Sequence, residues 1–301
     1  MRIAVAATPD VAIPTLEALQ ASSHELICVI TKPDAPAGRG RELQSSAVAQ
    51  WAVKNVIPVF KPSSSSEISS YLANIDLVLT VGFGFMIPES VLKIPKHGFI
   101  NLHFSLLPRW RGAAPVQRAI EAGDGRTGVT VFKLDRGMDT GPIYTTAECD
   151  LIAGINSEEL LNSLAILGVG PVLDAIELIA KGELPKEQNH VGATRASKLT
   201  KEEGHLDWNT DGAVIQRKIA AFNPNPGAWS IFRGQILKIN RAQLTKVSLP
   251  VGKLKFEQRA VIVGTGSYAL EILEVTPAGK KTIDAESWAN GARITSEDLL
   301  T

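Results

Sequence analysis

Short apolar runs alternate with amphipathic stretches through the first half of the chain. The apolar runs predict strands at 2–7, 25–32, 57–60, 76–83 and 98–104. The stretches between them have helical spacing and predict helices at 14–22, 45–55 and 66–74. Near-continuous apolar strands that alternate with helices are typical of a parallel sheet with both faces covered.

The alternation of predicted strands and helices continues to about Lys181, and a polar segment follows it. A helix is predicted at 113–123, strands at 127–135 and 142–151, and a long helix from Ser157 to about Lys181. Residues 182–204 are polar and irregular and contain proline and glycine, which is typical of a linker.

Beyond this segment the hydrophobic pattern becomes that of a second domain. A helix over 212–222 places Ile215, Ile219 and Phe222 on one face. Short alternating runs follow, and their spacing predicts a small β-barrel. We therefore predict an α/β fold, with a Rossmann-like, mostly parallel sheet in the first domain and an OB-like β-barrel in the second. We predict that the first domain covers residues 1–189, that a linker covers 190–206, and that the second domain covers 207–301.

Composition excludes several classes of protein. The mean hydropathy is +0.07, and no run of apolar residues is long enough to span a bilayer, so we expect no membrane partner. The two cysteines are too few for a disulfide framework or a cysteine-based zinc site, so we expect no metal and a reducing, cytoplasmic location. The first strand ends in Ala-Ala-Thr-Pro-Asp, which lacks the glycines of a dinucleotide site, and no Walker-type phosphate loop is present.

Whole-chain neutrality hides an uneven charge distribution. Residues 1–207 contain 19 basic and 23 acidic side chains, whereas residues 208–301 contain 12 basic and 8 acidic ones. Within 211–255 Asp211 is the one acidic residue, against eight basic residues: Arg217, Lys218, Arg233, Lys238, Arg241, Lys246, Lys253 and Lys255. Such a segment can be an ordinary solvated face, but beside a small barrel it favours a surface that follows nucleic-acid phosphates.

The densest polar cluster within an apolar frame lies at 100–115. Asn101 and His103 are two residues apart on a predicted strand, so their side chains point to the same face near the strand's carboxyl end. Ligands of open α/β sheets bind at that end. Ser105, Leu106, Leu107 and Pro108 then form a turn whose backbone groups could hold a ligand.

A second cluster follows the strand at 127–135. Asp135 and Asp139 flank a Gly-Met step, where either carboxylate could cap a turn. Alternatively, Asp139 could approach His103 and hold the imidazole charged and oriented. Asn, His and Asp without a Ser or Cys nucleophile indicate oxyanion stabilisation and proton transfer during attack by a substrate's own nucleophile.

The segment 31–44 is a long loop with prolines, glycines and basic side chains. Loops of this length in compact domains are usually either functional or disordered. Local composition leaves both interpretations open.

Two motifs at these positions carry a resemblance to a known family. Asn101-Leu-His103-x-Ser105-Leu-Leu-Pro108-x-x-Arg111-Gly112 and Gly137-Met-Asp139-Thr-Gly141 resemble the signature of 10-formyltetrahydrofolate-dependent formyltransferases. These two motifs alone do not identify one member of the family. They are also found in glycinamide ribonucleotide formyltransferases, in sugar-nucleotide formyltransferases and in the hydrolase domain of formyltetrahydrofolate dehydrogenase. Gly82-Phe83-Gly84 stands where the family usually has Ala-Tyr-Gly.

Further segments narrow the resemblance to the methionyl-tRNA formyltransferases. The loop from Lys32 to Gly40 resembles the insertion by which those enzymes contact the tRNA acceptor stem, and Lys198–Trp208 resembles their interdomain junction. The segments 222–229 and 277–281 resemble their C-terminal domain. The similarity extends from Arg2 to about Ala292.

The resemblance implies formyl transfer from 10-formyltetrahydrofolate to the α-amine of methionyl initiator tRNA, by a monomer. Asn101 and His103 would stabilise the oxyanion, and Asp139 would orient His103. The implied folate-pocket residues are Ser105, Leu106, Leu107, Pro108, Phe83 and Gly84. The implied tRNA contacts are Lys32, Arg39, Arg41, Arg217 and Lys218.

Two other functions share parts of this pattern. Formyl transfer to an amino-sugar nucleotide would use the same catalytic cluster, but the long basic loop argues against it. A non-catalytic RNA-binding protein could use the same scaffold, but Asn101, His103 and Asp139 are all present.

Overall fold

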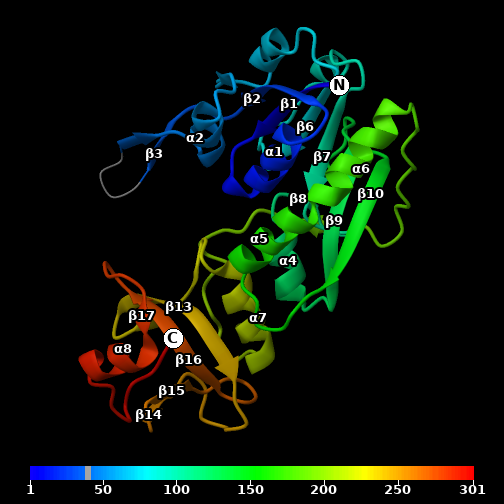
Figure 1. The fold of residues 1–301 in the computed structure, drawn as a ribbon. Coiled ribbons are helices and arrows are strands. Elements are labelled where there is room, and N and C mark those ends of the chain that lie inside the picture. The colour runs from blue at the N-terminus through cyan, green and yellow to red at the C-terminus, as the bar shows by residue number, and fades with distance from the viewer. Residues whose placement is uncertain (38–41) are drawn as a thin grey trace. The chain divides into compact units, whose positions relative to one another are not determined.

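The computed structural model describes residues 1–37 and 42–301. Arg39 and Arg41 lie outside the described residues. Contacts divide the chain into two compact units (Figure 1). The first unit contains 1–115, 126–150 and 161–196, and the second contains 116–125, 151–160 and 197–301.

A seven-stranded sheet forms the centre of the first unit (Figure 1). Its strands, in spatial order, are β10 (Ile143–Asp150), β9 (Arg126–Lys133), β7 (Phe99–His103), β6 (Leu77–Val81), β1 (Arg2–Ala7), β2 (Glu25–Ile30) and β5 (Val59–Phe60). The five strands from β7 to β5 pair in parallel. β9 runs antiparallel to both of its neighbours, so the prediction of a mostly parallel sheet is confirmed.

Helices and apolar side chains cover both faces of this sheet. The helical elements of this unit are η1 (Asp10–Ala12), α1 (Ile13–Gln20), α2 (Ala47–Lys54), η2 (Glu67–Tyr71), α3 (Glu89–Leu92) and α6 (Val169–Ala180). Of the remaining helices before residue 181, α5 (Ser157–Leu167) is divided between the two units, and α4 (Pro115–Ala122) belongs to the second unit apart from Pro115. The element predicted over 66–74 is thus a short 3₁₀ helix. One face packs Phe99 and Cys28 against Ile68 of η2 and Leu92 of α3. Burial there raises the pKa of the Cys28 thiol to about 11, which keeps this thiol unreactive.

The alternation of side chains along β7 determines which face of the sheet carries the predicted active-site residues. Asn101 and His103 share the face of Phe99, whereas Leu102 points to the opposite one. Gly168, between α5 and α6, lies against Leu102, and a Cβ there would come within 2.8 Å of the leucine side chain. Helix α6 therefore covers the face opposite the site.

One helical stretch in the described part of the chain, Ser157–Ala180, is long and apolar enough to cross a membrane by length and composition alone. It is divided by Gly168 into α5 and α6. In α6, Val172, Ala175 and Ile176 are fully buried, and the helix contacts β9 and β10. Its apolar side chains thus form part of the domain core.

Two small sheets, of two strands each, involve segments that the sequence predicts to be a loop or a linker. Residues 31–44 contain a short antiparallel hairpin of β3 (Ala35–Ala37) and β4 (Glu42–Gln44). Within the segment predicted as a linker, β11 (Arg195–Ala196) pairs in parallel with β8 (Arg111–Gly112). The latter pairing brings a polar, irregular stretch of sequence against the predicted active-site turn.

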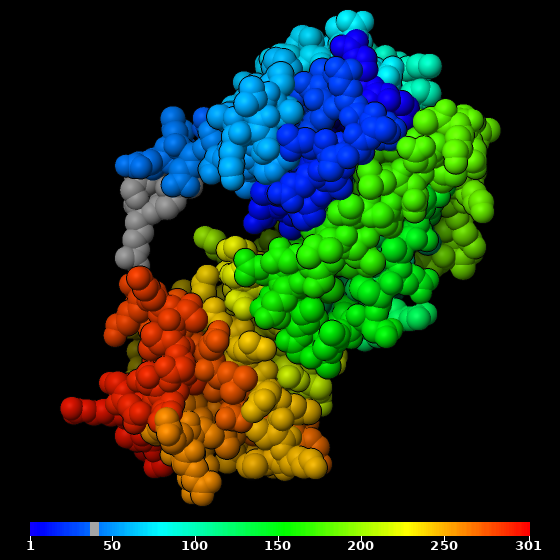
Figure 2. All heavy atoms as spheres, in the orientation of Figure 1, coloured from blue at the N-terminus to red at the C-terminus, as the bar shows by residue number. Residues whose placement is uncertain are grey.

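The second unit contains a six-stranded antiparallel sheet (Figure 1). Five of its strands lie side by side in the order β12 (Ala228–Phe232), β13 (Gln235–Leu244), β16 (Leu270–Pro277), β15 (Ala260–Val263) and β14 (Leu254–Glu257). β17 (Ile283–Asp284) pairs with β16. Helix α7 (Gly212–Phe222) has the predicted bounds, and α8 (Ala285–Ala292) follows β17. Residues 197–301, yellow to red in Figure 2, form one continuous body.

The last four residues join the two edges of this sheet. Ile231 of β12 exchanges two backbone hydrogen bonds with Thr301, at 2.7 and 3.1 Å. On the other edge, Leu254 N–H donates to Asp298 O at 3.1 Å, and Leu300 N–H donates to Gly252 O at 2.9 Å. The strands therefore close into a barrel-like body through residues 298–301.

Candidate active site

Asn101 is oriented by a neighbouring strand. Thr80 of β6 pairs with Asn101 in the parallel register, and its hydroxyl donates to Asn101 Oδ1 at 2.8 Å. This contact fixes the amide so that the Nδ2 group remains as a donor. Within the described residues, no hydrogen bond engages Asn101 Nδ2.

His103 is almost fully buried, with 6% of its surface exposed. Its Nε2–H donates to the carbonyl oxygen of Trp110 at 2.9 Å, so this contact sets the tautomer and ring orientation. The other ring nitrogen, Nδ1, lies 3.8 Å from Asp139 Oδ2. Nδ1 is therefore the nitrogen that faces the carboxylate.

Asp139 occupies a left-handed backbone conformation with φ of 55°. Its Oδ2 accepts a hydrogen bond from Gly112 N–H at 2.8 Å. Gly112 has φ of 127°, and a Cβ there would lie 2.6 Å from the carbonyl oxygen of Ala196, so only glycine fits. The structure thus brings His103 and Asp139 together.

Asp135 has a different role from Asp139. Its carboxylate accepts hydrogen bonds from Gly137 N–H at 2.8 Å and from the Thr140 hydroxyl at 2.8 Å. These contacts are those of a turn cap. The sequence predicted a turn cap for Asp135 and left open, for Asp139, a turn cap or an approach to His103. The tertiary fold places the Asp139 carboxylate beside His103.

The turn at Ser105–Pro108 is held from inside. The Thr130 hydroxyl donates to Ser105 O at 2.7 Å and accepts from Leu107 N–H at 3.1 Å. The Ser105 hydroxyl donates to Arg109 O at 2.6 Å, and its side chain is buried. Leu107 is buried, whereas Leu106 and Pro108 are partly exposed.

Phe83, Gly84 and Lys32 lie at the carboxyl ends of β6 and β2. Phe83 is 4% exposed and packs in the hydrophobic core. Gly84 is exposed, with φ of 73°, and a Cβ there would lie 2.9 Å from Lys32 Nζ. The Lys32 ammonium is also 5.3 Å from the centroid of the Phe85 ring. Lys32 and Gly84 are therefore neighbours, whereas Phe83 supports their turn from within.

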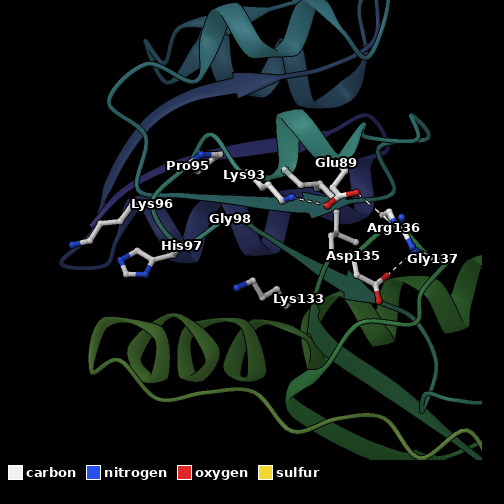
Figure 3. Close-up of a pocket in the computed structure, with 12 residues that line it drawn as sticks. Glu89, Lys93, Pro95, Lys96, His97, Gly98, Lys133, Asp135, Arg136 and Gly137 are labelled. Carbon is white, nitrogen blue, oxygen red and sulfur yellow. Dashed lines mark hydrogen bonds and ion pairs between the residues drawn. The ribbon is translucent and has the colours of Figure 1, made fainter.

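A separate groove of about 680 Å³ lies beside the segment that leads to Asp139 (Figure 3). Lys93 and Arg136 pair with Glu89 there. Burial and the nearby Lys96 lower the pKa of His97. None of Asn101, His103 or the six predicted folate-pocket residues lines this groove.

The predicted tRNA contacts in the second unit already have partners within that unit. Arg217 Nε donates to Glu121 O at 3.3 Å, and Lys218 Nζ donates to His205 O at 2.9 Å. Arg233 forms two hydrogen bonds with Asp298, at 2.7 and 2.6 Å. For Arg241 and Lys246, no hydrogen bond or ion pair is found in the described part of the unit, which leaves both cations available to a ligand.

Several residues that shape the site were not singled out from the sequence. Thr80 and Thr130 lie in apolar strands, where a lone threonine carries no distinguishing signal. Gln188 lies in the polar, irregular segment 182–204, just before the predicted linker at 190–206, yet its amide contacts the Asp139 loop. In the described residues, no group of three or more His, Cys, Asp or Glu side chains could hold a metal ion.

The arrangement can stabilise developing negative charge and move a proton. An amide donor and an imidazole project from one strand face, and a carboxylate lies beside the imidazole. Fixed donors of this kind act strongly on an oxyanion because they need no reorganisation. With no Ser or Cys nucleophile among these groups, the site suits direct transfer between two substrates.

Fold and site together define a formyltransferase. The model of the formyl transferases matches residues 1–175, and the model of the formyl transferase C-terminal domain matches residues 198–293. A methionyl-tRNA formyltransferase of Streptomyces avermitilis is 42% identical, with 100% of this chain and 99% of that protein covered. The chain therefore belongs to the methionyl-tRNA formyltransferase family.

Two solved structures share the fold. WlaRD, a sugar 3N-formyl transferase crystallised with dTDP and 5-N-formyl-THF, has a TM-score of 0.68 at 18% identity, covering 93% of this chain and 99% of its own. HypX from Aquifex aeolicus, in complex with tetrahydrofolic acid, has a TM-score of 0.69 at 19% identity, covering 96% of this chain. This chain spans about half of HypX, 46% of its length.

Thr80→Val is expected to lower kcat about tenfold, because Asn101 Oδ1 then loses a donor and the amide is no longer held. Steady-state kinetics of the purified variant would measure this. Thr15→Val is a matched control, since Thr15 is equally buried and its hydroxyl has no partner in the described chain. Equal kcat values for Thr80→Val and wild type would show that the contact does not orient the amide.

Proposed function

We propose that this chain transfers the formyl group of 10-formyltetrahydrofolate to the α-amine of methionine on initiator tRNA. The observation that carries the proposal is the convergence of Asn101, His103 and Asp139 at one end of β7. The chain's 42% identity to a methionyl-tRNA formyltransferase over its full length supports the choice of acceptor.

The proposed reaction begins when the neutral amine attacks the formyl carbon. Negative charge develops on the formyl oxygen, which Asn101 Nδ2 and the protonated Nδ1 of His103 stabilise. Asp139 Oδ2 lies 3.8 Å from Nδ1 and is proposed to orient the ring. On collapse, the bond from carbon to N10 breaks. The attacking nitrogen loses one proton and N10 gains one, and the His103–Asp139 pair mediates this transfer.

The folate donor is supported by family membership and by the folates bound to two proteins of the same fold. We propose that Gly84, Leu106 and Pro108 contact the folate directly, while the side chains of Ser105, Leu107 and Phe83 support the turns from inside the protein.

Because the proposed acceptor is an aminoacylated tRNA, we propose that the protein acts in the cytoplasm. We propose that the protein acts as a monomer.

One assay tests the function. The full chain is incubated with 10-formyltetrahydrofolate and methionyl initiator tRNA. The aminoacyl group is then released, and its mass is measured by mass spectrometry. The expected result is the mass gain of one CO unit, dependent on both substrates. No gain on this tRNA, with formylation of an amino-sugar nucleotide instead, would overturn the proposal.

The second unit is proposed to bind the tRNA backbone through Arg217, Lys218, Arg241 and Lys246, which form no ion pair in the described part of the unit, with Lys32, Arg39 and Arg41 acting from the loop of the first unit. The double variant Arg241→Ala/Lys246→Ala is expected to raise the Kd for tRNA roughly tenfold and to reduce the salt dependence of log Kd by about one to two.

Fluorescence titration over a range of salt concentrations would measure both effects. Lys255→Ala is the control, because Lys255 already pairs with Glu257. An unchanged salt dependence in the double variant would place the phosphate contacts elsewhere.

A further inference from the structure

Gln188 links two parts of the candidate active site that are far apart in sequence. Its Nε2 group donates to the backbone carbonyl of Asp139 at 3.0 Å and to that of Gly141 at 2.6 Å. Its Oε1 accepts from the Arg111 guanidinium at 2.6 Å. Only 6% of the Gln188 surface is exposed. Its contact with Gly141 O is buried, and its contacts with Asp139 O and with Arg111 are partly buried.

These contacts belong to one hydrogen-bond network that also includes the contacts of His103 and of the Asp139 carboxylate. Trp110 and Gly112, the neighbours of Arg111, contact His103 Nε2 and Asp139 Oδ2 respectively. Gln188 joins Arg111 to the backbone of Asp139. The Asp139 loop is therefore held both by Gly112 N–H, at the carboxylate, and by one amide from a third segment, at the backbone.

The backbone near Gln188 reinforces the same turn. Thr194 O accepts from Arg111 N–H at 2.9 Å, and the Thr194 hydroxyl accepts from Trp110 N–H at 2.9 Å. Ala196 O accepts from Ala113 N–H at 2.9 Å. The segment 188–196 therefore fixes residues 110–113 from outside, although it contributes no group to the proposed reaction.

An amide suits this position better than any charged group. The two carbonyls need two donors, and Arg111 needs an acceptor, and a single primary amide supplies both. The left-handed backbone of Asp139 is an uncommon conformation for a non-glycine residue, which persists only where its surroundings hold it. Two donors on the carbonyls of residues 139 and 141 are such a constraint.

We propose that Gln188 is a positioning residue for the formyl-transfer reaction, which sets the Asp139 carboxylate against His103. This inference rests on the proposed function. It predicts that Gln188 affects the chemical step rather than substrate binding, because its side-chain oxygen and nitrogen both bond to protein groups. A displacement of about 1 Å at a catalytic group can cost on the order of 100-fold in rate.

Gln188→Ala and Gln188→Glu test the proposal in the full chain. Both should lower kcat about 10–100-fold with KM values for folate and tRNA within about threefold of wild type. Asn189→Ala is the control, because Asn189 is the exposed neighbour whose side chain contacts only Val191 N–H in the described residues. A thermal melt of each variant checks that it is folded.

A double-mutant cycle separates positioning from general structural support. If Gln188 acts through Asp139, Gln188→Ala should lower kcat little further when Asp139 is already alanine. Additive losses, or a wild-type kcat in both Gln188 variants, would overturn the inference. A wild-type kcat in Asp139→Ala would instead overturn the proposed roles of His103 and Asp139, so the two failures are distinguishable.

Discussion

Asp139→Asn is expected to lower kcat for formyl transfer about 10³-fold, with the Kd for tRNA nearly unchanged. The asparagine keeps the size of the side chain and an oxygen that can accept from Gly112 N–H. It removes the negative charge that lies 3.8 Å from His103 Nδ1. The variant therefore isolates the effect of the charge from that of the fold. His103→Ala should lose turnover to a similar extent.

Asp135→Asn is the matched control, because Asp135 lies in the same loop and its carboxylate caps a turn. It should retain kcat within a few-fold. Single-turnover kinetics with saturating substrates would report the chemical step directly. Near-normal turnover in Asp139→Asn would show that the carboxylate does not act in catalysis.

Deletion of Asp298–Thr301 is expected to destabilise the second unit by about 5 kcal/mol. The deletion removes the backbone hydrogen bonds to both edge strands, the buried Leu300 side chain and the ion pair with Arg233. The barrel-like sheet would then have two open edges. Tight tRNA binding should be lost with it.

Calorimetry of the truncated and complete chains would measure this loss. Leu299→Ala is the control, because 46% of the Leu299 surface is exposed, and it should shift the transition little. An unchanged transition in the truncated chain would mean that the sheet does not need its closing segment.

The Arg233–Asp298 pair adds a pH dependence to this unit. The Arg233 guanidinium lowers the pKa of the Asp298 carboxyl to about 2. A lowered pKa means that the pair stabilises the fold fully above the ordinary aspartate range. The stabilisation is lost as the pH falls from about 4 towards 2, and Asp298→Asn should remove this part of the acid sensitivity.

The local sequence determined most strands of the large sheet and which residues are candidates for the chemistry. Apolar periodicity predicted the strands of the sheet and the bounds of α7, because burial on one face selects residues by spacing alone. The same periodicity placed Asn101 and His103 on one face of β7, because alternate residues of a strand share a face.

Tertiary structure decided how these residues are held. Thr80 and Gln188 come from segments far from Asn101 and Asp139, which they contact, whereas Trp110 contacts His103 across a turn of seven residues. Hydrogen bonds between distant segments leave no periodic trace in a sequence, so Thr80 looked like a strand residue and Gln188 like part of a linker. For Asp139, the sequence left open a turn cap or an approach to His103, and the contacts of its carboxylate with Gly112 N–H and near His103 Nδ1 are long-range features of the tertiary structure.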